Sequence, residues 1–142
     1  MPWPKATPMP DERLAERPDK IYVGQPGHLH LEAACTLLHH AFGPCYLVGP
    51  CLERRDYRHV DIRIILADDT FADLFGAGYE QARRTPRWIV LSAGLGAYLG
   101  QATGLPVDVQ VQSQAWSDRW FADKRRVPVG ALLMPDGGGP DA

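Results

Sequence analysis

The chain has 142 residues, a formal net charge of -2 at pH 7 and 45% hydrophobic residues. This length is typical of one domain, and the near balance of charge argues against a strongly basic nucleic-acid-binding protein. No apolar run approaches the roughly 20 residues that span a bilayer, so we expect no membrane partner. The three cysteines have no CxxC spacing, which favours reduced thiols in a cytoplasmic protein over a disulfide framework or a zinc site.

Proline and glycine divide the chain into three segments. The first, residues 1–26, carries six prolines, which block a regular helix or a central strand and predict a flexible arm. The last, residues 127–142, is rich in proline and glycine and predicts a flexible tail. Residues 27–126 remain as the single folded domain.

The domain begins with a predicted amphipathic helix. Apolar side chains recur at spacings of three and four over residues 28–42, and Gly43-Pro44 ends the pattern. Four histidines lie on this segment, but no two have the i, i+4 spacing of a helical metal site. We therefore interpret them as solvated or capping residues.

Two strands flanking a glycine turn follow this helix. Cys45–Val48 is the first, ending at Gly49-Pro50, and Val60–Leu66 is the second. The ten residues between Pro50 and Asp61 are enough for a surface loop but too few for a crossover helix. Because residues two apart on a strand share a face, Asp61 and Arg63 point to the same side.

The remaining pattern alternates helices with one more strand. We expect a helix at Asp68–Phe75, with Asp68 or Asp69 as its N-cap, and a long helix over residues 88–102. Strict alternation over residues 107–112 predicts a half-buried strand that carries Asp108, and residues 113–121 form a last helix. Together these elements predict an α+β (α/β) domain with a small sheet packed against helices.

The order of these features resembles the DNA polymerase beta superfamily of nucleotidyltransferases, most closely its short single-domain members in phages and bacteria. The matching residues are Gly49, Asp61 at the expected spacing after it, and Asp108 on a later strand; the resemblance covers about residues 29–123. It implies a small mixed sheet, and it implies that Asp61 and Asp108 lie on one face of that sheet, close enough to share an ion.

The resemblance also implies a reaction, which is Mg²⁺-dependent transfer of a nucleotidyl group from a nucleoside triphosphate to an acceptor such as RNA or protein. Asp61 and Asp108 would bind Mg²⁺, and Asp108 would also activate the attacking hydroxyl. The turn at Gly49 and Pro50 would contact the phosphates. Three arginines of the following loop would add phosphate contacts, namely Arg54, Arg55 and Arg58.

Two residues depart from the pattern of that superfamily. Pro50 stands where Gly or Ser is usual, which removes a backbone donor, and Arg63 stands in the position assigned to the second carboxylate, which disfavours a nearby cation. One hypothesis is a working enzyme with a single Mg²⁺ and with Arg63 on the triphosphate. The alternative is a catalytically inactive member in which Arg63 pairs with Asp61 or Asp108, and which binds a nucleotide, RNA or protein. An unrelated α+β domain is the third possibility.

Aromatic and basic side chains outside the motif admit two interpretations each. Trp116 and Trp120 have the i, i+4 spacing of one helix face, which favours core packing over stacking on a nucleobase. The arginines at 83, 84 and 87 and the basic residues at 124–126 form either solvated patches or a path for a polyanion.

Overall fold

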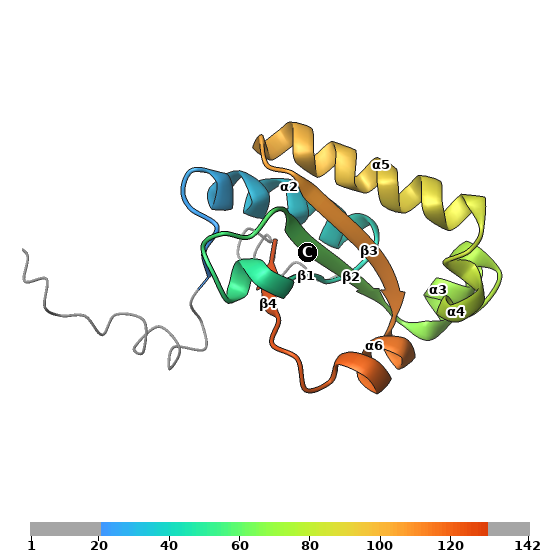
Figure 1. Cartoon of the computed structure of the whole chain (residues 1–142). Coiled ribbons are helices and arrows are strands. Elements are labelled where there is room, and N and C mark those ends of the chain that lie inside the picture. Colours follow the sequence, from blue (N-terminus) through green and yellow to red (C-terminus); the bar gives the residue numbers. More distant parts are fainter. Residues whose placement is uncertain (1–20, 131–142) are drawn as a thin grey trace, which may run out of the picture.

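Within residues 21–130, which the computed structural model describes, a four-stranded mixed sheet with the order β3-β2-β1-β4 forms the centre of the molecule (Figure 1). Its strands are β1 (Cys45–Val48), β2 (Val60–Leu66), β3 (Val107–Ser113) and β4 (Val127–Val129). β1 runs antiparallel to β2 and β4, whereas β2 and β3 are parallel. The predicted α+β class is confirmed, and residues 1–20 of the predicted arm and 131–142 of the predicted tail lie outside the described residues.

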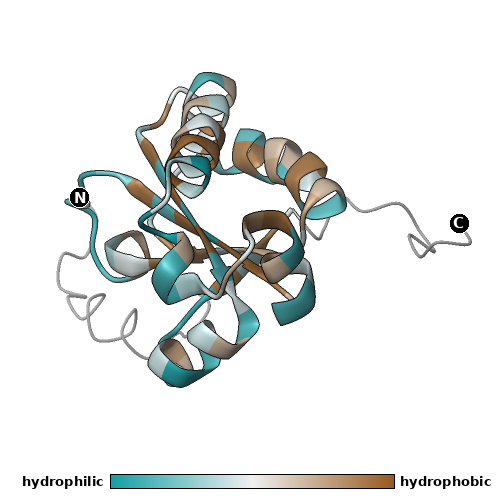
Figure 2. Ribbon diagram, turned by 90° about the vertical axis from the view of Figure 1, so that its right-hand side faces the viewer, coloured by the Kyte–Doolittle hydropathy of each residue, from teal (hydrophilic) through white to brown (hydrophobic). Residues whose placement is uncertain are grey.

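Two helices, α2 (Gly27–Ala41) and α5 (Pro86–Thr103), pack together against one face of this sheet (Figure 1). Val60, Ile62 and Ile64 of β2 point to that face and are at most 1% exposed. Hydrophobic residues follow the strands through the centre of the molecule (Figure 2). The alternation that predicted the strands therefore sorts the apolar side chains into this core.

The opposite face of the sheet carries the charged and amide residues of β2 and β3. Asp61 and Arg63 of β2 lie there, beside Asp108 and Gln110 of β3. α6 (Gln114–Phe121) contacts β2 and β3. α3 (Asp68–Phe75) and α4 (Tyr79–Ala82) follow β2, and the short 3-10 helix η1 (Gly49–Leu52) follows β1. None of the helices in the described part of the chain is long and apolar enough to cross a membrane.

The predicted helices and strands of residues 27–121 are all present, with bounds that differ by a few residues. α5 begins at Pro86 rather than at residue 88, because Thr85 caps it by accepting a hydrogen bond from the Trp88 amide. The N-cap predicted for α3 is wrong. Ala67 holds that position and makes no side-chain cap, whereas Asp68 accepts a hydrogen bond of 2.9 Å from the Ala115 amide, in the first turn of α6.

β4 is a strand inside the segment 127–142, for which the sequence predicts a flexible tail. It is short, but Val129 is fully buried, and Pro128 is tolerated because β4 is an edge strand. The next residue, Gly130, is tied to α2: its amide donates to Glu32 Oε1 at 2.7 Å, and its carbonyl accepts from Thr36 Oγ1 at 3.0 Å. These long-range contacts are invisible in a local pattern.

Substitutions of two glycines test this anchoring of β4. Gly130 has φ +93°, and a Cβ there would lie 2.7 Å from the Cys35 backbone, so we expect Gly130→Ala to lower the free energy of unfolding by about 2–4 kcal/mol. Gly94 is an exposed residue of α5 with open space around its Cβ position, so Gly94→Ala is expected to raise that energy by up to about 1 kcal/mol. Urea unfolding followed by circular dichroism measures both. An unchanged midpoint in Gly130→Ala contradicts the anchoring.

Candidate functional site

The register of the two parallel strands brings together two carboxylates that are distant in the sequence. β2 and β3 pair with Asp61 directly opposite Asp108. Because opposite residues of neighbouring strands share a face, both carboxylates lie on the polar face, near the point where the two strands begin. The structure therefore places side by side the two aspartates that the sequence analysis paired.

A third side chain, His59, completes this cluster. One ligand atom from each of His59, Asp61 and Asp108 lies within 4.8 Å of the others, and His59 Nε2 is 3.2 Å from Asp61 Oδ1. It is the one such group of His, Cys, Asp and Glu residues among those that the structure describes. His59 was not predicted from the sequence, although it lies two residues before Asp61 in an extended segment, a spacing that places both side chains on one face.

The cluster carries unfavourable negative charge. Burial raises the pKa of the Asp61 carboxyl, and the negative charge of Asp108 raises it further, whereas the positive charges of His59 and Arg63 oppose the rise. The fold therefore disfavours the ionised form of Asp61. A cation held between the two carboxylates would relieve this penalty.

Gly49 lies against the Asp61 carboxylate. Its φ is +81°, and a Cβ at this position would lie 2.6 Å from Asp61 Oδ2. Only glycine satisfies both the backbone angle and the close approach. The turn between β1 and η1 is thus part of the wall of the cluster.

The loop that joins η1 to β2 carries the three arginines predicted to bind phosphate. Arg54, Arg55 and Arg58 are exposed there, and Arg54 Nε lies 3.2 Å from Asp56 Oδ1. Pro50 is the second residue of η1, and its carbonyl accepts hydrogen bonds from the amides of Glu53 and Arg54. None of these contacts joins the loop arginines to the cluster in the described part of the chain.

Arg63 lies on the same face as Asp61 but turns to a different neighbour. Its guanidinium carbon is 4.1 Å from the centre of the Phe121 ring, and the residue is 8% exposed. Among residues 21–130 no carboxylate lies within 4.0 Å of it, and its Nε has no hydrogen-bond partner. The salt bridge to Asp61 or Asp108 that one hypothesis requires is therefore not formed.

A second guanidinium, that of Arg126, lies close to this buried arginine. Burial lowers the pKa of Arg63, and the positive charge of Arg126 lowers it further. Arg126 stacks at 4.4 Å on the ring of Tyr46, the residue that pairs with Arg63 across the sheet. The polar face of the sheet therefore carries two like-charged pairs, the carboxylates of Asp61 and Asp108 and the guanidinium groups of Arg63 and Arg126.

This arrangement can hold one metal ion and, beside it, an anion. Two carboxylate oxygens and one imidazole nitrogen suit Mn²⁺ or Zn²⁺, while Mg²⁺ prefers oxygen ligands alone. Two guanidinium groups supply the planar donors that phosphate oxygens accept. The third residue of the metal-ligating group is thus His59. Arg63, which occupies the position of the second carboxylate in the superfamily pattern, is not part of the group.

No family model, curated protein or solved structure matches this chain.

The raised pKa of Asp61 has a measurable consequence for metal-free protein in EDTA. The folded state binds the Asp61 proton more tightly than the unfolded chain, so ionisation costs stability above the folded-state pKa, and this cost disappears as pH falls through it. We expect Asp61→Asn to raise the melting temperature at pH 7, with a gain that shrinks towards pH 4.

Thermal unfolding by calorimetry at both pH values measures this effect. The exposed Asp73→Asn is the matched control and is expected to change little at either pH. A lower melting temperature of Asp61→Asn at pH 7 would mean that the carboxylate is held by a cationic partner instead.

Proposed function

We propose that this chain is a divalent-cation-dependent nucleotidyltransferase that moves a nucleotidyl group from a nucleoside triphosphate to an acceptor hydroxyl on RNA or protein. The observation that carries the proposal is the meeting of Asp61 and Asp108 with His59, walled by Gly49. The order of elements supports it, because helix, strand, glycine turn, aspartate strand, helices and second aspartate strand follow one another here as the resemblance implies.

The roles follow from the chemistry of the side chains. His59, Asp61 and Asp108 would hold the cation, and the cation would neutralise charge on the triphosphate. Asp108, exposed at the edge of the cluster, accepts the proton of the acceptor hydroxyl. The acceptor oxygen then forms a bond to the α-phosphorus, the bond to the bridging oxygen breaks, and pyrophosphate leaves.

The two arginines beside the cluster fit the remaining phosphates. Arg63 has an unpartnered Nε and lies near Arg126, so an anion between them would be attracted by both. In this role Arg63 lies outside the group of residues that would bind the cation. It would bind the leaving pyrophosphate, which makes this departure from the superfamily pattern compatible with transfer.

A second candidate function is nucleotide binding without catalysis. It is favoured by the size of the cluster, because three ligands suit one ion, whereas phosphoryl transfer often uses two ions about 3.5–4 Å apart. A module of this kind would bind a nucleotide, an RNA end or a protein through the same face. Binding and transfer must therefore be measured separately.

The deciding experiment incubates the protein with each α-³²P-labelled nucleoside triphosphate, Mg²⁺ or Mn²⁺, and mixed RNA and protein acceptors. We expect labelled acceptor with the wild-type chain, and a loss of about 100-fold or more in Asp61→Asn and Asp108→Asn, because each removes a cation ligand. Asp73→Asn is the control with the same chemical change on an exposed aspartate outside the cluster.

Calorimetry with the same nucleotides separates the two candidate functions. Nucleotide binding that requires the cation and weakens in Arg63→Met, without any label transfer, supports the binding module. Absence of both binding and transfer with every nucleotide at millimolar concentration rejects both candidates. Arg63→Met keeps an apolar side chain against Phe121, so its fold is expected to survive.

His59 predicts which cation the cluster prefers. With an imidazole among the ligands we expect Mn²⁺ or Zn²⁺ to raise the melting temperature more than Mg²⁺ does. His59→Asp makes all three ligands carboxylates and should shift the preference towards Mg²⁺, while His59→Ala should weaken all three ions. Equal shifts for the wild type and His59→Ala in a thermal melt series would show that His59 is no ligand.

A further inference from the structure

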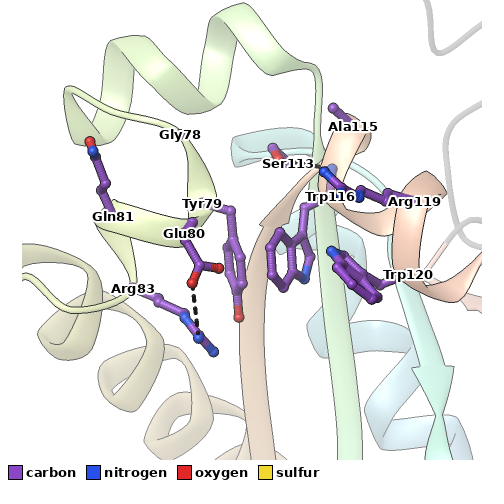
Figure 3. Close-up of a pocket in the computed structure, with 10 residues that line it drawn as sticks. All are labelled: Gly78, Tyr79, Glu80, Gln81, Arg83, Ser113, Ala115, Trp116, Arg119 and Trp120. Carbon is purple, nitrogen blue, oxygen red and sulfur yellow. Dashed lines mark hydrogen bonds and ion pairs between the residues drawn. The ribbon is translucent and has the colours of Figure 1, made fainter.

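A cleft lies apart from the group His59, Asp61 and Asp108, which we call the metal cluster. The cleft is formed by α4 on one side and by the end of β3 and α6 on the other. Its volume is about 730 Å³, and its lining includes three aromatic residues, Tyr79, Trp116 and Trp120, and two arginines, Arg83 and Arg119. Figure 3 shows the three aromatic side chains side by side, with Arg83 next to Tyr79 and Arg119 at the other end. Neither His59, Asp61 nor Asp108 lines this cleft.

The aromatic side chains form a row that leads from the core to the surface. Trp88 contacts Tyr79 edge to face at 5.9 Å, Tyr79 contacts Trp116 at 4.9 Å, and Trp116 contacts Trp120 at 5.7 Å between ring centres. Tyr79 is buried, whereas Trp120 is 51% exposed. Core packing thus accounts for the inner part of the row, but the indole of Trp120 is left with a large solvent-exposed surface.

The arginines of the cleft lie over these rings. Arg83 is 5.9 Å from the Tyr79 ring centre and 5.8 Å from that of Trp116, while Arg119 is 5.2 Å from that of Trp120. Glu80 is the one acidic residue of the lining, and both Arg83 and Arg84 contact its carboxylate at 3.5 Å. Arg119 has no carboxylate within 4.0 Å among residues 21–130. The lining as a whole is therefore cationic.

We propose that this cleft binds single-stranded nucleic acid, with a base stacked on Trp120 and the flanking phosphates at Arg119 and Arg83. A flat ring next to cationic groups is what an unpaired nucleotide requires, because every base offers a π-face and every linkage a negative charge. A duplex keeps its bases stacked inside and offers the cleft phosphates alone. The cleft should therefore distinguish single-stranded from double-stranded nucleic acid, and it should not distinguish one base sequence from another.

The proposal extends beyond nucleotidyl transfer and does not depend on it. The cleft lies at the end of β3 where Ser113 lies, and the metal cluster lies at the end where β3 begins. α6 connects the two regions, because it carries Trp116, Arg119 and Trp120 into the cleft and places Phe121 on Arg63. Binding in the cleft should persist when the metal cluster is removed.

Fluorescence anisotropy with labelled single-stranded 10-mers of dT, dA and rU, and with a duplex of the same length, tests the proposal. We expect single strands of different sequence to bind similarly and the duplex to bind at least about fivefold more weakly. Trp120→Ala should weaken single-strand binding about 5- to 100-fold, because stacking on one ring is lost. Trp120→Phe should restore most of the binding.

Matched variants separate cleft binding from general effects. Ile89→Ala removes a side chain that is 50% exposed on α5, and Arg87→Gln removes an exposed arginine of the same helix; both should bind as the wild type does. Arg119→Gln should weaken binding and reduce the slope of log K against log salt by about 0.7, which corresponds to one phosphate contact. Circular dichroism verifies that each variant is folded.

Three outcomes overturn the proposal: no single-strand binding at 50 µM protein in low salt, equal binding of duplex and single strand, or wild-type binding by Trp120→Ala. Self-association that Trp120→Ala abolishes, in the absence of oligonucleotide binding, would assign the cleft to protein contact instead. The anisotropy assay contains neither nucleoside triphosphate nor divalent cation, so failure of the proposed transfer reaction leaves this test intact.

Discussion

The parallel pairing of β2 with β3 is the constraint on which the rest of the structure depends. It sets Asp61 opposite Asp108 on a face where burial already disfavours ionisation of Asp61. The opposite face of both strands is largely apolar and buried, and α5 contacts β3 on that side, so a slip of one residue would turn these carboxylates into the core. The packing that stabilises the sheet is therefore the same packing that holds two repelling charges together.

Around this pair, the polar face of the sheet keeps its charges in separate places. Negative charge gathers where β2 and β3 begin, and His59 lies beside it. Positive charge gathers one pleat further on, where Arg63 rests on Phe121 and Arg126 rests on Tyr46. Aromatic rings, rather than carboxylates, support both guanidinium groups. Among residues 21–130, neither guanidinium therefore has a carboxylate within 4.0 Å, whereas Asp61 is paired with His59 at 3.2 Å.

Helix α6 links this face with the aromatic cleft. Phe121 covers Arg63, while Trp116 of the same helix contacts Tyr79 of α4 and Arg83, the C-cap of α4. Asp68 at the start of α3 accepts a hydrogen bond from the first turn of α6 and so positions its entry. A change in the packing of α6 would act on both regions at once.

Local patterns in the sequence determined the longer helices and β1 to β3 between residues 27 and 121, because apolar spacing and the glycine and proline stops are properties of short segments; the short η1 and α4 were not predicted. Local patterns also determined that Asp61 and Arg63 share a strand face. Tertiary structure alone decided which of these residues and segments contact one another. The path of the chain into β2 brings His59, rather than Arg63, next to Asp61 and Asp108. β4 depends on contacts with α2, which is nearly a hundred residues away in the sequence. The cleft exists only because α4 and α6 lie close together. Such contacts join segments that are distant in the sequence and leave no local pattern in either segment, so only the folded chain reveals them.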